Sequence, residues 1–113
     1  MRIDSLMRIA FAALIAMDCV LWAGFAELDV RIDDRDDLSN SNLSAMNLEG
    51  AHLNQSDLQG CNLNGSNLSG AYLRSAWLMA SHLNGAKLQN ADLTGAVLTE
   101  ADLSGADLTG ANL

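Results

Sequence analysis

The sequence predicts an all-β solenoid that follows an N-terminal hydrophobic α-helix. Three observations lead to this fold class. A leucine occurs at every fifth residue from Leu38 to Leu113, a small residue stands two positions before nearly all of these leucines, and the residues before position 36 do not share the period. We therefore divide the chain into a hydrophobic segment at 1–26, an acidic connector at 27–35 and a repeat domain at 36–113.

The first 26 residues contain a long apolar run. Residues 9–26 read IAFAALIAMDCVLWAGFA, and Arg2 and Arg8 precede them. A basic flank followed by an apolar stretch is typical of a secretory signal peptide or an N-terminal membrane anchor. Asp18 counts against insertion, because a carboxylate within a membrane is costly. The alternative is a helix that caps the solenoid, since the end coils of a solenoid need to be shielded.

The connector shows the period of two that is typical of a strand. Apolar residues alternate there with charged ones, in the order Leu28, Asp29, Val30, Arg31, Ile32 and Asp33. This alternation predicts a short strand that leads into the first coil.

The repeat domain fits neither a regular helix nor a flat strand. In an α-helix, a step of five residues turns each leucine about 140° from the last, so the leucines would surround the helix axis. In a flat strand, an odd step sends alternate leucines to opposite faces. The pattern is consistent only if the chain turns a corner once in every five residues. The inward leucines are then Leu38, Leu43, Leu48, Leu53, Leu58, Leu63, Leu68, Leu73, Leu78, Leu83, Leu88, Leu93, Leu98, Leu103, Leu108 and Leu113.

The five-residue unit has the form A-[DN]-L-x-x, as in 91–95, 101–105 and 106–110. In this pattern the domain resembles pentapeptide-repeat proteins. The resemblance implies a right-handed quadrilateral β-helix with four pentads in each coil, and therefore about four coils. With coils spaced like neighbouring strands, at about 4.8 Å, the stack is about 19 Å tall.

One group of outward residues departs from the polar pattern. Residues twenty apart stack in one column, and most columns carry Asn, Asp, Lys or His. Tyr72, Trp77, Met79 and Val97 are large or apolar residues at outward positions. Exposed apolar patches commonly mark contact sites, so we predict a partner-binding patch here. The alternative is that the N-terminal helix folds back over these residues.

Composition and charge exclude several classes of function. The net charge of −8 argues against direct nucleic-acid binding, which needs clustered cations. No catalytic residue, cofactor or metal site is expected, because His52 and His82 fall on opposite faces and no serine has a base beside it. Cys61 occupies an inward position, so we interpret it as a core residue.

Two functions remain. The first is a non-catalytic rigid scaffold or protein-binding module whose protein partner the sequence does not identify. The second, implied by the family resemblance, is a DNA-mimicking inhibitor or protector of a type II topoisomerase. We expect the β-helix to be exported or held at a membrane through residues 9–26, with a cytoplasmic location as the alternative. We also expect a homodimer through the C-terminal coil, because an uncapped coil edge can pair with another chain.

Overall fold

The computed structural model describes residues 34–113, which repeat one small motif from end to end. Each pentad supplies a single-residue β-bridge followed by a two-residue turn. The bridges fall at every fifth position from Asp37 to Asn112, and within this range there is neither a helix nor a longer strand. The domain is therefore built from corners and very short straight segments.

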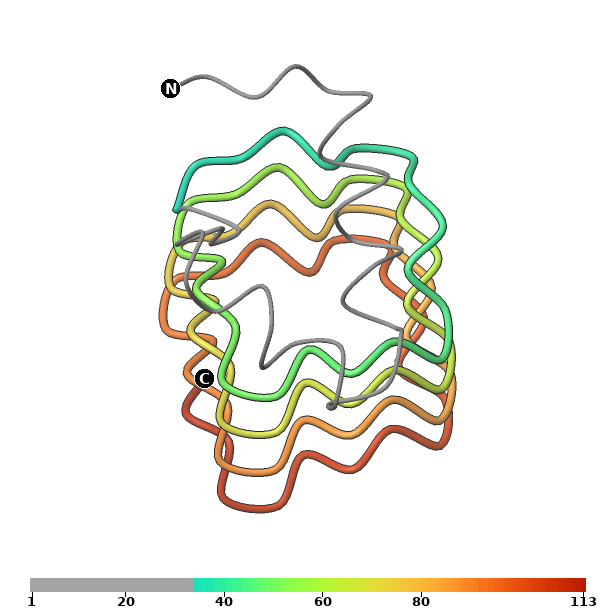
Figure 1. The fold of residues 1–113 in the computed structure, drawn as a ribbon, viewed down its shortest axis with the longest axis vertical. Coiled ribbons are helices and arrows are strands. Elements are labelled where there is room, and N and C mark those ends of the chain that lie inside the picture. Colours follow the sequence, from blue (N-terminus) through green and yellow to red (C-terminus); the bar gives the residue numbers. More distant parts are fainter. Residues whose placement is uncertain (1–33) are drawn as a thin grey trace, which may run out of the picture.

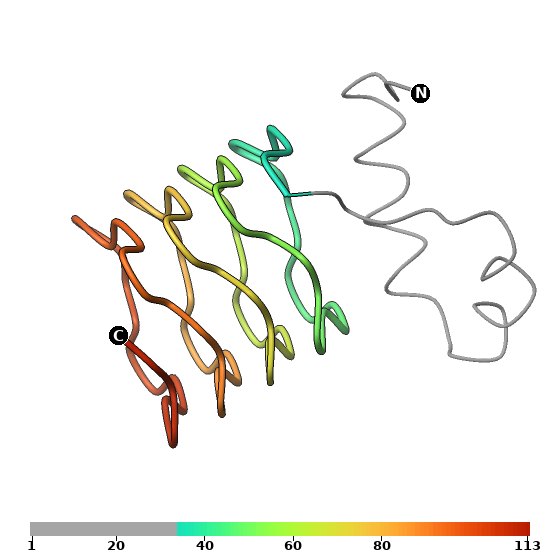
Figure 2. The same ribbon diagram turned by 90° about the vertical axis from the view of Figure 1, so that its left-hand side faces the viewer.

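The bridges show that four pentads make one coil. Each bridge is parallel and joins a residue to the one twenty positions later, as in Asp37 with Asp57 and Asp57 with Trp77. The coils are 37–56, 57–76, 77–96 and 97–113, and they stack in sequence order from the cyan coil to the red one (Figures 1 and 2). The predicted four-sided solenoid of four coils is confirmed; its right-handed sense stays a prediction from the family resemblance.

Four columns of outward residues define the four faces, each named here after one member. They are the Trp77 face (Asp37, Asp57, Trp77, Val97), the Asn42 face (Asn42, Asn62, His82, Asp102), the Asn47 face (Asn47, Asn67, Lys87, Asp107) and the Tyr72 face (His52, Tyr72, Asp92, Asn112). Neighbouring coils are joined by backbone hydrogen bonds. The Leu38 amide donates to the Asp57 carbonyl, and the Asp57 amide donates to the Asp36 carbonyl, both at 2.8 Å.

The corners require one residue in the left-handed region. The second turn residue of every pentad from Arg35 to Gly110 has a φ between 54° and 74°, and half of these residues are glycines. In nearly every turn the amide of the next inward residue donates to the leucine carbonyl three positions earlier, as from Ser41 to Leu38 at 3.1 Å. A positive φ at the third residue only, with this hydrogen bond, defines a type II turn.

The interior holds the leucines and the small residues that precede them. All leucines from Leu38 to Leu93 are at most 2% exposed. Leu98, Leu103 and Leu108 are only partly buried, and Leu113 is 72% exposed. Placing Leu113 in the core was therefore wrong, because no described coil stacks on the far side of this residue.

The predicted helix at 1–26 and the strand within 27–33 lie outside the described residues, and so does the apolar run at 9–26. Residues 34 and 35 form a turn. Within 34–113 there is no helix with the length and hydropathy needed to span a membrane.

Candidate protein-binding surface

Most outward Asp and Asn side chains stabilise the turn that follows them. The side-chain oxygen of such a residue accepts a hydrogen bond from the amide two positions later, which is the first turn residue. This bond is 3.1 Å from Ser39 to Asp37 and 3.0 Å from Ser104 to Asp102. Such Asx bonds between a side chain and the nearby backbone favour the turn conformation. The same contact is made by Asn42, Asn47, Asp57, Asn62, Asn67, Asp92 and Asp107.

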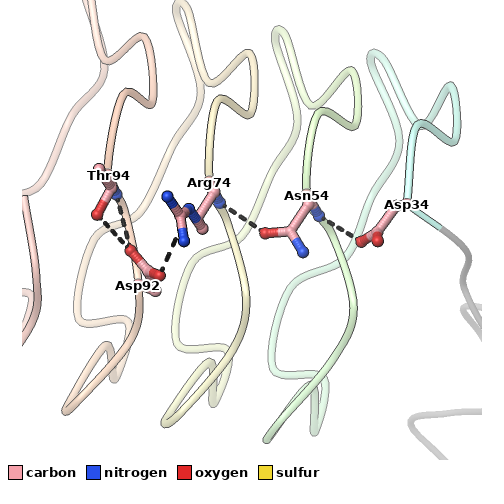
Figure 3. Close-up of polar contacts among 5 residues, drawn as sticks. All are labelled: Asp34, Asn54, Arg74, Asp92 and Thr94. Atoms are coloured by element: carbon pink, nitrogen blue, oxygen red, sulfur yellow. Dashed lines mark hydrogen bonds and ion pairs between the residues drawn. The ribbon is translucent and has the colours of Figure 1, made fainter.

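Where an outward residue is His or Tyr, the coil before it supplies the missing acceptor. His52 and Tyr72 cannot make the Asx bond. The Asn54 amide instead donates to the Asp34 side chain, and the Arg74 amide donates to the Asn54 side chain, both at 2.9 Å (Figure 3). On the Asn42 face, in the turn after His82, the Asn84 amide likewise donates to the Asn64 side chain. These turns therefore keep their polar contact.

The Trp77 face lacks both kinds of support in its last two coils. The first turn residues after Trp77 and Val97 are Met79 and Thr99, and neither amide has a side-chain acceptor within residues 34–113. Trp77 and Val97 thus occupy positions where an Asp or Asn would stabilise the turn. A structural role for these outward side chains is not apparent from their contacts, which makes them candidates for a function.

The predicted patch is divided by a corner of the solenoid. Trp77 and Val97 are bridged neighbours on one face, and Met79 follows Trp77 at the turn. Trp77 is 48% exposed, whereas Met79 and Val97 are partly buried. Tyr72 is 46% exposed but lies on the adjacent Tyr72 face. The four residues therefore form a three-residue apolar strip on the Trp77 face and a separate tyrosine around the corner.

Two residues beside the patch were not assigned to it from the sequence. The His52 ring stacks on the Tyr72 ring, with centroids 4.9 Å apart and planes 25° apart. Their spacing of twenty places the two residues in one column, but it does not show that the rings stack. Arg74 lies between the two faces, and its Nε is 3.8 Å from Asp92 Oδ2 (Figure 3). The corner thus presents Tyr, Arg and Trp, the residue types most enriched at interface hot spots.

The acid beside Arg74 remains charged at neutral pH. Hydrogen bonds from the Thr94 hydroxyl and the Thr94 amide hold the pKa of Asp92 below its usual value, and Arg74 adds to this effect. The Arg74 side chain is 63% exposed, so this ion pair is in contact with solvent and contributes little to stability.

The described residues do not gather the groups that a metal ion needs. Within 34–113 no three His, Cys, Asp or Glu side chains cluster. His52 and His82 lie on opposite faces. Cys61 is buried, and burial raises the pKa of its thiol to about 11. The thiol is therefore protonated at neutral pH and is a poor nucleophile.

The comparison with protein families gives one match. The family described as "Pentapeptide repeats" matches residues 37–74 and 76–113 in eight copies. Among curated protein sequences, none matches this chain.

Solved structures of similar proteins share the solenoid. A pentapeptide-repeat protein (Rfr23) from the cyanobacterium Cyanothece 51142 is 39% identical over 67% of this chain and 52% of its own length, with a TM-score of 0.67. A second one, alr5209 from Nostoc Pcc 7120, is 35% identical over 86% of this chain and 75% of its own, also with a TM-score of 0.67. The chain therefore spans about half the length of the first and three quarters of the second.

Proposed function

Because the chain belongs to the pentapeptide-repeat family, we propose that it is a non-catalytic, rigid scaffold that binds a protein partner through the Trp77 face. One observation carries this proposal. Trp77 is 48% exposed at a position where most other pentads have a turn-stabilising Asp or Asn. Trp is the residue most favoured as an interface anchor, and Met79 and Val97 extend the same apolar strip.

The solenoid supports the role of a rigid display surface. Every coil is joined to the next by backbone hydrogen bonds on all four faces, and the five-residue pattern runs through residues 34–113 without an inserted loop. The backbone that carries a side chain on such a face is held in place before a partner arrives. Less entropy is then lost on binding than with a mobile loop.

DNA mimicry is the alternative function. The negative charge of the solenoid supports it less well than the exposed tryptophan supports protein binding, because this charge is lower than that of DNA of the same height. Residues 34–113 carry nine acidic side chains against Arg35, Arg74 and Lys87, a net charge of −6. A DNA duplex of the same height, about 19 Å, carries about eleven phosphates. Inhibition of gyrase supercoiling by the purified chain would favour mimicry over our proposal.

Site-specific photo-crosslinking tests the binding face. We expect a benzophenone amino acid at position 77 to capture a discrete protein in cells of the native host. The same group at position 67, on the opposite Asn47 face, is the matched control and should capture none. Equal capture at both positions would refute the proposal. A crosslink from position 77 to residues 1–33 of the same chain would support the fold-back alternative instead.

Two further proposals concern assembly and location. The partly exposed leucines of coil 97–113 support a homodimer contact through this coil, which sedimentation of the purified chain at several concentrations would test. Export, or a membrane tether through residues 9–26, stays a prediction from the sequence. The intact mass of the native protein would show whether this segment is retained.

A further inference from the structure

The Trp77 face changes character along the solenoid axis. Its outward residues in coils 37–56 and 57–76 are Asp37 and Asp57, and in the next two coils they are Trp77 and Val97. Because each bridges the next, they form one continuous column. An acidic half therefore adjoins an apolar half, with successive side chains about 4.8 Å apart.

Among the described residues, the acid nearest to Trp77 has no cation to pair with. Asp57 Oδ1 accepts a hydrogen bond from the Gln59 amide at 3.1 Å, and within residues 34–113 the carboxylate makes no ion pair. The arginines nearest in sequence have other contacts. Arg35 Nε donates to Gln55 at 2.9 Å, and Arg74 lies 3.8 Å from Asp92. Within residues 34–113, Asp57 therefore presents negative charge without a cationic partner, one coil before Trp77 in the same column.

The size of the face limits what it can bind. Four coils span about 19 Å along the axis, and a face is about 10 Å wide, the usual spacing of packed sheets. The area is then about 200 Å², whereas a stable interface between globular proteins covers about 800 Å² on each partner. A second folded copy would need more surface than this face offers, but a short segment would not.

From these observations we propose that the Trp77 face binds a short extended peptide segment that has a basic residue at one end and apolar residues at the other. This proposal rests on the function proposed above and specifies the partner's chemistry. In an extended chain, alternate residues lie about 6.7 Å apart on one side. A Lys-x-Leu-x-Leu pattern therefore spans about 13 Å, which fits within the column of outward residues, since the three coil steps from Asp37 to Val97 cover about 14 Å. The net charge of −8 also attracts a basic segment in the approach to binding.

Defined peptides test this partner class. The probes are fluorescent ten-residue peptides that contain Lys-Ser-Leu-Ser-Leu, its reversed order, or the same sequences with Lys replaced by Glu or with both Leu replaced by Ser. Anisotropy is measured with the full chain at low and at physiological salt. We expect at least one lysine peptide to bind at least tenfold more tightly than its Glu and Ser counterparts, and more weakly as salt rises.

Variants of the chain locate the binding. Asp57→Asn keeps an acceptor for the Gln59 amide, so it should fold and should weaken the lysine peptide about fivefold or more. Trp77→Ala should weaken the same peptide at least as much. Asn67→Asp, on the opposite face, is the control and should leave binding unchanged.

Three results would overturn the proposal. These are equal binding of the Glu peptides, no effect of Asp57→Asn, and no binding of any probe at 1 mM. If the peptides fail but position 77 still crosslinks to a protein, the peptide class is wrong and the binding face stands. If crosslinking at position 77 fails as well, the proposed function is also wrong.

Discussion

At the scale of the residue, an outward side chain can either stabilise its own turn or remain available to contact a partner. The carboxylate or amide oxygen of an outward Asp or Asn reaches the amide two positions later, and this contact occupies the side chain. In the turns that follow His52 and Tyr72, a side chain from the preceding coil accepts this hydrogen bond instead. Trp77 has no such substitute within the described residues, so its turn is expected to be the less stable one.

Acid should weaken the turn that depends on Asp102. Hydrogen bonds from the Ser104 hydroxyl, the Asn84 side chain and the Ser104 amide lower the pKa of Asp102 to about 2 from 3.8. A group with a lowered folded-state pKa contributes stability above pH 4 and loses this contribution as the pH falls to 2. The melting temperature should therefore decrease as the pH is lowered from about 4 to about 2.

Asp102→Asn is the variant that isolates this effect. It keeps the oxygen acceptor without the charge, so part of the decline between pH 4 and 2 should disappear. Glu100→Gln is the control, since the Glu100 side chain makes no hydrogen bond within residues 34–113. An unchanged pH profile for Asp102→Asn would contradict the assignment.

At the scale of the element, the pentad turn is constrained by its second residue. Eight of these residues are not glycine, although their φ angles lie in the left-handed region. Asn40 and Asn90 tolerate this region better than other residues do. Ala45 and Ala80 have no polar side chain to compensate, so their turns carry conformational strain of about 1 kcal/mol each.

Exchanging glycine and alanine at this position should change stability in opposite directions. Gly50 has a φ of 67° and open space where a Cβ would lie, so Gly50→Ala should cost about 1 kcal/mol from backbone strain alone. Ala45→Gly should relieve strain of similar size, reduced by the greater entropy of glycine in the unfolded chain. Urea unfolding of both variants measures the difference, and two changes of the same sign would disprove the turn assignment.

At the scale of the whole molecule, stability comes from stacking one coil on the next. The leucines of the inner coils are enclosed from both sides, whereas those of coil 97–113 have a described neighbour on one side only. In a solenoid each repeat contacts only its neighbours. The contribution of a leucine to the free energy of unfolding should therefore depend on the coil in which it lies.

Truncating leucines of one column measures this dependence. Leu68 and Leu108 occupy equivalent positions on the Asn47 face, but Leu68 is fully buried and Leu108 only partly. Leu68→Ala should cost about 2–5 kcal/mol, the range for a buried leucine, and Leu108→Ala clearly less. Thermal or urea unfolding gives both values. Equal losses would mean that coil 97–113 is covered in solution.

The period of the sequence determined the framework of this protein. One corner in every five residues places each leucine inside and the residue before it outside, and neither an α-helix nor a flat strand satisfies both demands. The columns of outward residues follow from the family resemblance, which supplied four pentads in each coil. The Trp77 strip could therefore be predicted as an exposed patch.

Only the tertiary structure decided which outward side chains meet. The stacking of His52 on Tyr72, the Asp34 and Asn54 acceptors that replace missing Asx bonds, and the exposure of Leu113 are not encoded in the period. The physical reason is that the period fixes the direction in which a side chain leaves the backbone. Its contacts depend on rotamer, length and the coil stacked beside it, and these arise only when the chain is folded.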